Sequence, residues 1–274
     1  MPTTIRDSDL DLLRYCHELR FCTIDHLAAL TGRHRQALSL RLLQLIAEKY
    51  IFRTVFPNPN QKHIYSIGTN GFKLLAFHGL IPFEDVPARL RTSELKPLFL
   101  SHTLLVTDIH AALILASRDS EKRLADWREG RELYESVTYY HAGRRIRLPV
   151  CPDAFFGIER NGEPKNRLSF ALEADRGTTT RRTFEDKLNA YWRFLEQNRQ
   201  TKAYGVKWFR VVTVTLTQAR ADGLATLARE SLPERFKKFF LFASQEHFSL
   251  ERPAGIFSAI YRTGKSEAPV LLMP

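Results

Sequence analysis

The second half of the chain contains the stretch PDAFFGIERNGEPKNRLSFALEAD, residues 152–175. It consists of two β-prone segments joined by a glycine-containing loop over 159–167, a pattern that favours an antiparallel hairpin. In adjacent antiparallel strands, Asp153 and Glu173 converge on one edge, and Asp175 follows directly. The stretch therefore predicts a β-sheet domain that gathers three acids at one end of a hairpin.

The three acids are candidates for a metal site. Paired carboxylates are the ligands that a hard divalent cation prefers, so Asp153 and Glu173 are candidate ligands for Mg²⁺ or Mn²⁺. Such a cation would polarise a phosphodiester and lower the pKa of an attacking water. The alternative is an ion-pair network with Arg176, Arg181 or Arg182 at a strand-to-helix turn, which the pattern favours slightly. Arg181 and Arg182 are equally candidates for contact with DNA phosphates.

The rest of the second half alternates β-prone and helical segments. The strand candidates are residues 133–141, 145–150, 153–158, 168–174, 209–215, 239–242 and 256–261. Helical periodicity covers about 180–197 and 218–230, and one deeply buried apolar helix is expected at 98–117. His102 and Asp108 interrupt that helix and are expected to make structural hydrogen bonds. The alternation predicts an α/β domain with a mixed sheet.

The first 80 residues predict a smaller, mainly helical unit. Apolar residues recur at helical spacing after Asp7 and Ser8 and again after Thr23, which are N-cap signals, and a third helix is expected at 33–49. Two short β-prone segments then flank a turn rich in proline and asparagine, and a fourth helix follows at 70–79. This order is typical of a winged helix, whose third helix enters the major groove of DNA.

The third helix and the ribbon carry the candidate DNA contacts. They are Arg33, His34, Arg35, Gln36, Arg53, Lys62 and His63. Cations there would meet phosphate, and polar side chains at the helix N-terminus would reach base edges. The alternative is a module that binds protein. Leu40 and Leu43 lie off the apolar face of the helix, which suggests that the second domain or a partner subunit of a homodimer covers them.

The charge of the chain points to a phosphate-bearing partner. Its 274 residues carry 41 Lys and Arg against 30 Asp and Glu, a net charge of +11. Residues 1–80 hold 10 basic and 6 acidic side chains (+4), 81–130 hold 7 and 8 (−1), and 131–274 hold 24 and 16 (+8). Two basic modules therefore flank a near-neutral connector, and double-stranded DNA is the leading partner. The alternative is a solvated basic surface with no nucleic-acid partner.

Several other classes are excluded or disfavoured by the composition. The hydrophobic fraction of 44% and charged fraction of 26% are those of a globular protein. No run of about 18 apolar residues stands out, and the first residues do not resemble a signal peptide, so a cytoplasmic location without a membrane partner is expected. The three cysteines, Cys16, Cys22 and Cys151, lack metal-ligand spacing and are expected to be buried thiols. The expected domains are 1–80 and 98–274, with a linker at 81–97.

Four short motifs occur in an order that resembles a known family. They are SHTLLVTD at 101–108, LPVCPDA at 148–154, LEADRGT at 172–178, and Lys187-Leu188 followed by Tyr191. Together with the expected winged helix, the chain resembles the replication-relaxation family over most of residues 1–215. The resemblance implies a protein of plasmids or other mobile elements that acts on DNA during replication, or during relaxation for transfer, with replication or relaxase machinery as partners.

The second domain also resembles the PD-(D/E)xK nuclease core, a restriction-endonuclease-like fold. That resemblance implies Asp153, Glu173, Asp175 and Lys187 as candidate catalytic residues. The sequence departs from the nuclease pattern where a lysine normally stands two residues after the glutamate, because this position is Asp175. Lys187 on the following helix is the candidate for a migrated lysine.

Three functions follow from these features. The favoured one is a DNA-binding accessory factor with a winged helix and a basic nuclease-like domain. The second is an Mg²⁺-dependent deoxyribonuclease or nickase that uses Asp153, Glu173 and Lys187. The third is an assembly protein whose basic faces bind an acidic partner. The missing lysine favours a protein that is not an enzyme.

Overall fold

The computed structural model describes residues 4–56, 61–83, 97–266 and 268–274. The chain divides into two compact units, Met1–Ala111 and Ala112–Pro274, and each is described by itself. Most of the predicted linker, 81–97, lies outside the described residues. The predicted domain boundaries therefore stay predictions.

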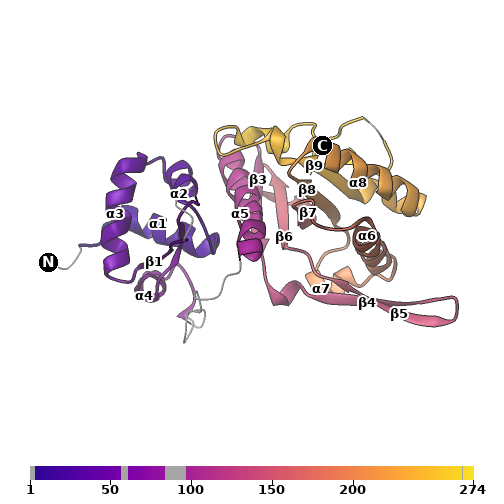
Figure 1. The fold of residues 1–274 in the computed structure, drawn as a ribbon, viewed down its shortest axis with the longest axis horizontal. Helices are drawn as coiled ribbons and strands as arrows, with labels where there is room; N and C mark the ends of the chain where they lie inside the picture. The colour runs from indigo at the N-terminus through magenta and orange to yellow at the C-terminus, as the bar shows by residue number, and fades with distance from the viewer. Residues whose placement is uncertain (1–3, 57–60, 84–96, 267) are drawn as a thin grey trace. The chain divides into compact units, whose positions relative to one another are not determined.

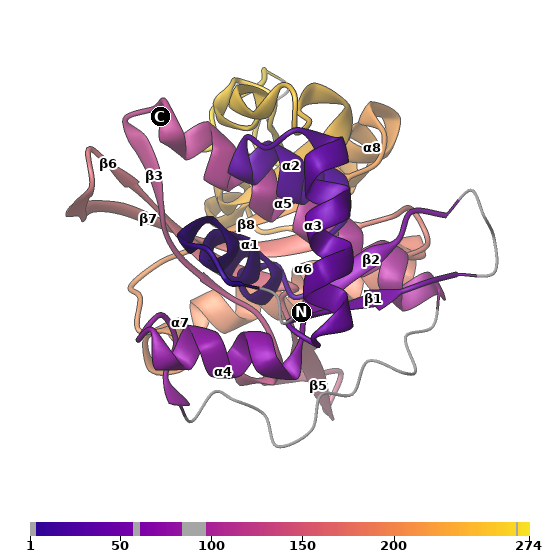
Figure 2. The ribbon, with the colours of Figure 1, turned by 90° about the vertical axis from the view of Figure 1, so that its left-hand side faces the viewer.

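The first unit consists of helices and a small hairpin, as the sequence predicts (Figure 2). Its elements are α1 (Asp7–Glu18), α2 (Ile24–Thr31), α3 (Arg35–Ala47), β1 (Ile51–Thr54), β2 (Ile64–Ile67) and α4 (Thr69–Phe77). Strands β1 and β2 are antiparallel and pair from Ile51 with Ile67 to Thr54 with Ile64. Leucines that recur at helical spacing on α1 and α3 are buried and form the core of this unit.

The helix boundaries follow from local capping. Thr23 caps α2 as predicted, and Gly32 ends this helix with a φ of 68°, a left-handed conformation that glycine adopts without strain. The cap predicted at Asp7 or Ser8 is wrong, because α1 has Arg6 at its N-cap. The backbone N–H of Arg6 donates to Asp9 Oδ2 at 2.9 Å, so the acid inside the first turn completes this cap.

Close backbone approach fixes the position of α4. A Cβ on Gly68 would lie 2.2 Å from the carbonyl oxygen of Lys49, and one on Gly71 would lie 2.3 Å from that of Tyr50. The Gly68 N–H donates to the Tyr50 carbonyl at 2.8 Å. Only glycine permits this contact between the start of α4 and the turn before β1.

Helix α5 (Pro97–Arg118) confirms the predicted apolar helix and begins in the first unit. Within that unit, His26 Nε2 lies 2.7 Å from Asp108 Oδ1, which is the kind of structural hydrogen bond expected of Asp108. The stretch Phe99–Arg118 is long and apolar enough to cross a membrane by these two criteria alone, and 61% of it is buried within the protein. A core helix of a globular protein meets the same criteria.

The second unit is built on a six-stranded mixed sheet in the order β10-β9-β8-β7-β6-β3 (Figure 1). The sheet strands are β3 (Lys122–Arg128), β6 (Ala154–Arg160), β7 (Glu163–Asp175), β8 (Arg210–Thr215), β9 (Phe240–Ser244) and β10 (Arg262–Thr263). Strands β7, β8 and β9 are parallel to one another, while β6 is antiparallel to β7. A separate antiparallel ribbon is formed by β4 (Glu135–His141) and β5 (Arg144–Val150).

Helices cover one face of this sheet. They are α6 (Arg181–Glu196) and α8 (Gln218–Ser231), with the short α7 (Gln200–Tyr204) after α6. Phenylalanines from the strands, such as Phe155 and Phe242, pack with Phe184 and Leu188 of α6 in one buried cluster. The sheet is therefore held by aromatic packing against α6 and α8.

Two expectations for the second unit are wrong, and one of its strands was not predicted. Residues 256–261 do not form a strand, because Pro253–Phe257 is a 3₁₀ helix and the edge strand is β10. The predicted loop 159–167 shrinks to a tight turn, since Asn161 and Gly162 both have positive φ and the strands continue on either side. Strand β3 carries charged residues on both faces, so its sequence gave no strand prediction.

Candidate functional site

The strand pairing brings the three predicted acids to one end of the β6–β7 hairpin. The Asp153 N–H donates to the Leu172 carbonyl at 2.9 Å, and Asp153 Oδ2 accepts from the Ala174 N–H at 2.8 Å. Glu173 and Asp175 are two residues apart on β7 and share one face of the sheet. The acid cluster, Asp153, Glu173 and Asp175, thus forms as the sequence predicts.

Glu173 is almost completely buried and is satisfied by two side chains of α6. Its Oε2 pairs with Lys187 Nζ, and its Oε1 accepts from the Tyr191 hydroxyl at 2.5 Å. Burial raises the pKa of Glu173, although the Lys187 ammonium opposes this effect. Burial alone would lower the pKa of Lys187, yet the neighbouring Glu173 carboxylate raises it above its usual range. Lys187 on α6 therefore reaches the end of β7, as predicted.

Asp175 has a different cationic partner. Arg220 Nε donates to Asp175 Oδ2 at 2.7 Å, and Arg220 Nη2 donates to the Thr179 carbonyl at 2.8 Å. Arg220 lies on α8, 45 residues along the chain from Asp175, so no local sequence signal pointed to it. Arg181, one of the three arginines expected to pair with the acids, pairs instead with Glu185 and with Glu230.

The carboxylates of the acid cluster are bonded largely within the protein, while Asp175 Oδ1 is buried without a hydrogen-bond partner. Both oxygens of Glu173 and one each of Asp153 and Asp175 already accept hydrogen bonds from protein donors. Among the residues that the structure describes, no group of three or more His, Cys, Asp or Glu side chains is placed to hold a metal ion. The geometry is that of an ion-pair network between strand ends and two helices.

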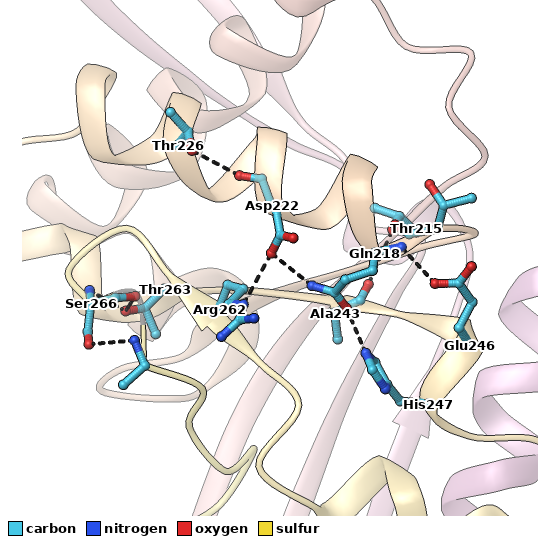
Figure 3. A network of polar contacts seen from close by, with 12 residues as sticks. Thr215, Gln218, Asp222, Thr226, Ala243, Glu246, His247, Arg262, Thr263 and Ser266 are labelled. Carbon is cyan, nitrogen blue, oxygen red and sulfur yellow. Dashed lines mark hydrogen bonds and ion pairs between the residues drawn. The ribbon is translucent and has the colours of Figure 1, made fainter.

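A second polar network lies at the N-terminus of α8 (Figure 3). The Gln218 N–H donates to Glu246 Oε2 at 2.8 Å, and the Gln218 side chain donates to Asp222 and lies 2.6 Å from His247 Nε2. Arg262 also donates to Asp222, at 3.1 Å. A glutamate of the chain itself therefore occupies the position at this helix terminus where a phosphate would bind.

The predicted DNA contacts lie around the start of α3. Arg33 and His34 precede the helix, with His34 at the N-cap, while Arg35 and Gln36 are exposed in its first turn. Arg33 Nη2 donates to the Ser8 carbonyl at 2.9 Å. Arg33 is thus partly used inside the unit, whereas His34 and Gln36 face solvent.

The ribbon cation joins the same region. Asp25 of α2 pairs with both Arg35 and Lys62, the latter at 2.8 Å. Burial would raise the pKa of Asp25, but the hydrogen bond and charge of Lys62 lower it. Arg53 on β1 is exposed. One acid thus draws the helix start and the ribbon cation together.

The outer face of α3 is exposed and partly apolar. Leu40 is 68% exposed and Leu43 is 49% exposed, and Gln36 and Ser39 lie beside them in the exposed set. The helix contains Arg35 and Arg41 but no Asp or Glu. The sequence expectation that Leu40 and Leu43 are covered by the second domain or by a partner subunit remains a prediction.

An interaction that the sequence did not reveal holds α3 from behind. Asp9 of α1 is buried, and Arg41 donates to it twice, from Nε at 3.0 Å and from Nη2 at 2.5 Å. Burial would raise the pKa of Asp9, but the Arg41 hydrogen bond and the Arg6 N–H lower it. The pair fixes the rotation of α3, so Gln36 and Leu40 face outward.

The cysteines differ from the prediction at one position. Cys16 and Cys22 are buried with their sulfurs 3.9 Å apart and are free thiols. Cys151 is exposed, because it precedes β6 in the segment that leads out of the β4–β5 ribbon. Partial burial of the thiol and the nearby Glu173 carboxylate raise its pKa.

Comparison with known proteins gives one match. The family model described as Replication-relaxation matches residues 13–208, which covers most of the first unit, the acid cluster and α6. No match was found among the curated proteins or among the solved structures. The resemblance inferred from the sequence motifs is confirmed over these residues.

Proposed function

Because the chain belongs to the replication-relaxation family, which makes it a replication-associated protein of plasmids or other mobile elements, we propose that it is a DNA-binding accessory factor. It binds duplex DNA through the first unit as a winged helix, and the second unit serves as a basic, nuclease-like platform. The process it supports is replication, relaxation or transfer of the element.

The outward face of α3 carries this proposal. The face is exposed, lacks acids, and is held in its orientation by the buried Asp9–Arg41 pair. An acid-free helix does not repel phosphate, and the positive end of the helix dipole points toward Arg35. At the start of the helix, Asp25 is shared between Arg35 and Lys62, so cations outnumber acids there, which suits an anionic partner.

The side chains on this face suit the floor of a major groove. The Gln36 side chain in the first turn is able to donate to N7 of adenine and to accept from its N6 amino group. Leu40, one turn further along, would contact the methyl group of thymine. Around this centre, Arg53 and Lys62 of the ribbon would contact backbone phosphates. The exposed leucines then have a role without a protein cover.

The second unit supports the proposal through charge and resemblance. Residues 131–274 carry a net charge of +8, from 24 basic and 16 acidic side chains. Its mixed sheet brings Lys187 to Glu173 of the acid cluster, which supports the proposed likeness to a PD-(D/E)xK core. Because these carboxylates are bound to protein donors, the unit is proposed to hold DNA rather than to cut it.

Equilibrium binding to a randomised pool of labelled duplexes tests the proposal. Selection followed by sequencing is expected to enrich sites that contain A·T pairs, and Gln36→Ala is expected to lose the enrichment while retaining weak binding. Ala47→Ser, on the exposed C-terminal end of the same helix, serves as the matched control. Absence of any duplex binding by the wild-type chain at low salt would reject the proposal.

A second candidate function is metal-dependent DNA nicking. The observation in its favour is that Asp153 and Lys187 both lie close enough to Glu173 to influence its pKa. A metal would require Glu173 to exchange its contacts with Lys187 and Tyr191 for the ion. Strand scission of supercoiled DNA in Mn²⁺ that is lost in Glu173→Gln, with duplex affinity unchanged, would favour this candidate.

A further inference from the structure

A groove lies on the second unit at the end of the sheet opposite the acid cluster. It is a hollow of about 1090 Å³, formed by the first residues of β8, the loop between α7 and β8, and parts of β3 and β7. Ser169 of β7 lines it, while Glu173 lies four residues further along the same strand. At about 3.3 Å per residue the two sites are about 13 Å apart along the strand, so the groove is separate from the acid cluster.

The groove presents an exposed aromatic platform. Trp208 is 51% exposed, and its ring is stacked on Phe239 with centroids 5.4 Å apart and planes 14° from parallel. Phe239 in turn contacts Phe236 of the core, with ring centroids 6.4 Å apart and planes inclined by 48°. The indole therefore has one face supported from below, and large exposed aromatic surfaces of this kind mark interaction sites.

Cations surround this platform. The lining contains Arg128, Arg167, Lys207, Arg210 and Lys238 against a single acid, Asp126. Asp126 is already paired with Arg167 at 2.7 Å and lies 3.8 Å from Arg128. Lys207 and Lys238 are exposed and directly precede Trp208 and Phe239 in the chain, and the Lys238 ammonium lies 5.3 Å from the centre of the Phe239 ring.

Arg167 is held in place across the sheet. Its guanidinium lies over Gly157 of β6, where an added Cβ would lie 2.4 Å from Arg167 Nε. The missing side chain at Gly157 therefore leaves the space in which Arg167 reaches Asp126. The ion pair with Arg167 neutralises Asp126, the one acid in the lining, so the groove remains basic.

We propose that this groove binds single-stranded DNA, with one base stacked on Trp208 and the adjoining phosphates on Lys207 and Lys238. Single-strand sites combine a basic groove with aromatic side chains on which unpaired bases stack. In a duplex the flat faces of the bases are covered by their neighbours, so Trp208 selects unpaired bases. The site is independent of α3, and its ligand is the strand exposed when a duplex is opened.

The test uses the full chain and a fluorescein-labelled twelve-nucleotide oligo(dT). Fluorescence anisotropy is expected to show saturable binding that Trp208→Ala weakens about ten-fold, the usual size of one lost stacking contact. Trp208→Phe, which keeps an aromatic face, is expected to recover most of the affinity. Tyr140→Ala is the matched control, because Tyr140 is 75% exposed on the β4–β5 ribbon and outside the groove.

Intrinsic fluorescence gives a second readout. The chain contains three tryptophans, and Trp208 is the most exposed of them, since Trp192 is buried and Trp127 is stacked on Phe156. Unlabelled oligo(dT) is expected to quench the emission of the wild type but not that of Trp208→Phe. No binding by the wild type, or equal affinity of Trp208→Ala and Tyr140→Ala, would overturn the proposal. Duplex binding by Trp208→Ala is measured separately. If the duplex is bound but oligo(dT) is not bound by the wild type, the groove proposal fails while the α3 proposal stands.

Discussion

The contacts of the Glu173 side chain indicate whether its role is structural or catalytic. Its carboxylate is buried between Lys187 and Tyr191, and removing Glu173 leaves both of them without this partner. An unsatisfied buried hydroxyl costs about 1–3 kcal/mol. The role of Glu173 therefore has a thermodynamic signature that does not depend on any reaction.

We expect Glu173→Ala to lower the free energy of unfolding by about 2 kcal/mol, because the Tyr191 hydroxyl is buried and loses its acceptor. Urea unfolding measures this loss.

We expect supercoiled DNA to stay intact in Mg²⁺ or Mn²⁺ when it is incubated with the wild type or with Asp153→Ala, Glu173→Ala or Lys187→Ala. Agarose gels show whether the DNA is nicked. Nicking by wild type that all three substitutions abolish would instead make Lys187 a migrated catalytic lysine.

His110 provides a pH-dependent term in the stability. Burial lowers its pKa to about 3, whereas the unfolded chain binds a proton near pH 6.5. A group with a depressed folded pKa contributes stability that is present above its unfolded pKa and is lost as the pH falls. Between about pH 6.5 and 5 we expect stability to fall by up to about 1.4 kcal/mol per pH unit. His110→Gln, unfolded by urea across this range, is expected to show a flatter profile.

At the scale of elements, the Asp9–Arg41 pair sets the orientation of α3. Asp9→Ala leaves Arg41 without its carboxylate partner where the arginine side chain is 13% exposed, and we expect a loss of about 3 kcal/mol in unfolding free energy. The double variant Asp9→Ala, Arg41→Met removes both charges and is expected to recover most of it. Asp11→Ala, on the exposed side of α1, is the control. Equal stability of Asp9→Ala and Asp11→Ala would show that the pair does not hold α3.

The elements also show where sequence reasoning succeeds. The helices of the first unit, its hairpin, and the strands on either side of the acid cluster were predictable because their apolar residues repeat at the helical or strand period. Strand β3 was not, since its charged residues form ion pairs across the sheet, such as Asp126 with Arg167. The segment 256–261 is apolar, but its first two residues end the 3₁₀ helix Pro253–Phe257, and apolar content alone does not separate a strand from such a turn.

The same limit applies to the candidate site. Convergence of Asp153 and Glu173 was predictable from hairpin pairing, and the return of Lys187 from helical geometry. The partners Arg220 and Arg41 were not, because each meets its acid across more than 30 residues of chain. Pairings of this kind depend on tertiary packing, which a single sequence does not encode in any local pattern.

At the scale of the whole molecule, the predicted domains 1–80 and 98–274 are expected to be separable. The segment 81–97 is rich in proline and polar residues between the two basic parts of the sequence. Limited trypsin digestion is expected to cut first at the arginines of this segment, since its lysine precedes a proline and resists trypsin, and to release two protease-resistant fragments. Mass spectrometry of the products identifies the sites. Initial cleavage confined to the chain ends would indicate that the two predicted domains share a core.

Duplex DNA binding as a function of salt tests the central claim most directly. A chain of net charge +11 that neutralises phosphates releases counterions, so the logarithm of the affinity should fall linearly with the logarithm of salt concentration. We expect a slope of about −0.9 for each phosphate contact, and Lys62→Ala should reduce its magnitude by about one relative to wild type. A salt-independent affinity, or no affinity for duplex DNA at low salt, would contradict the account.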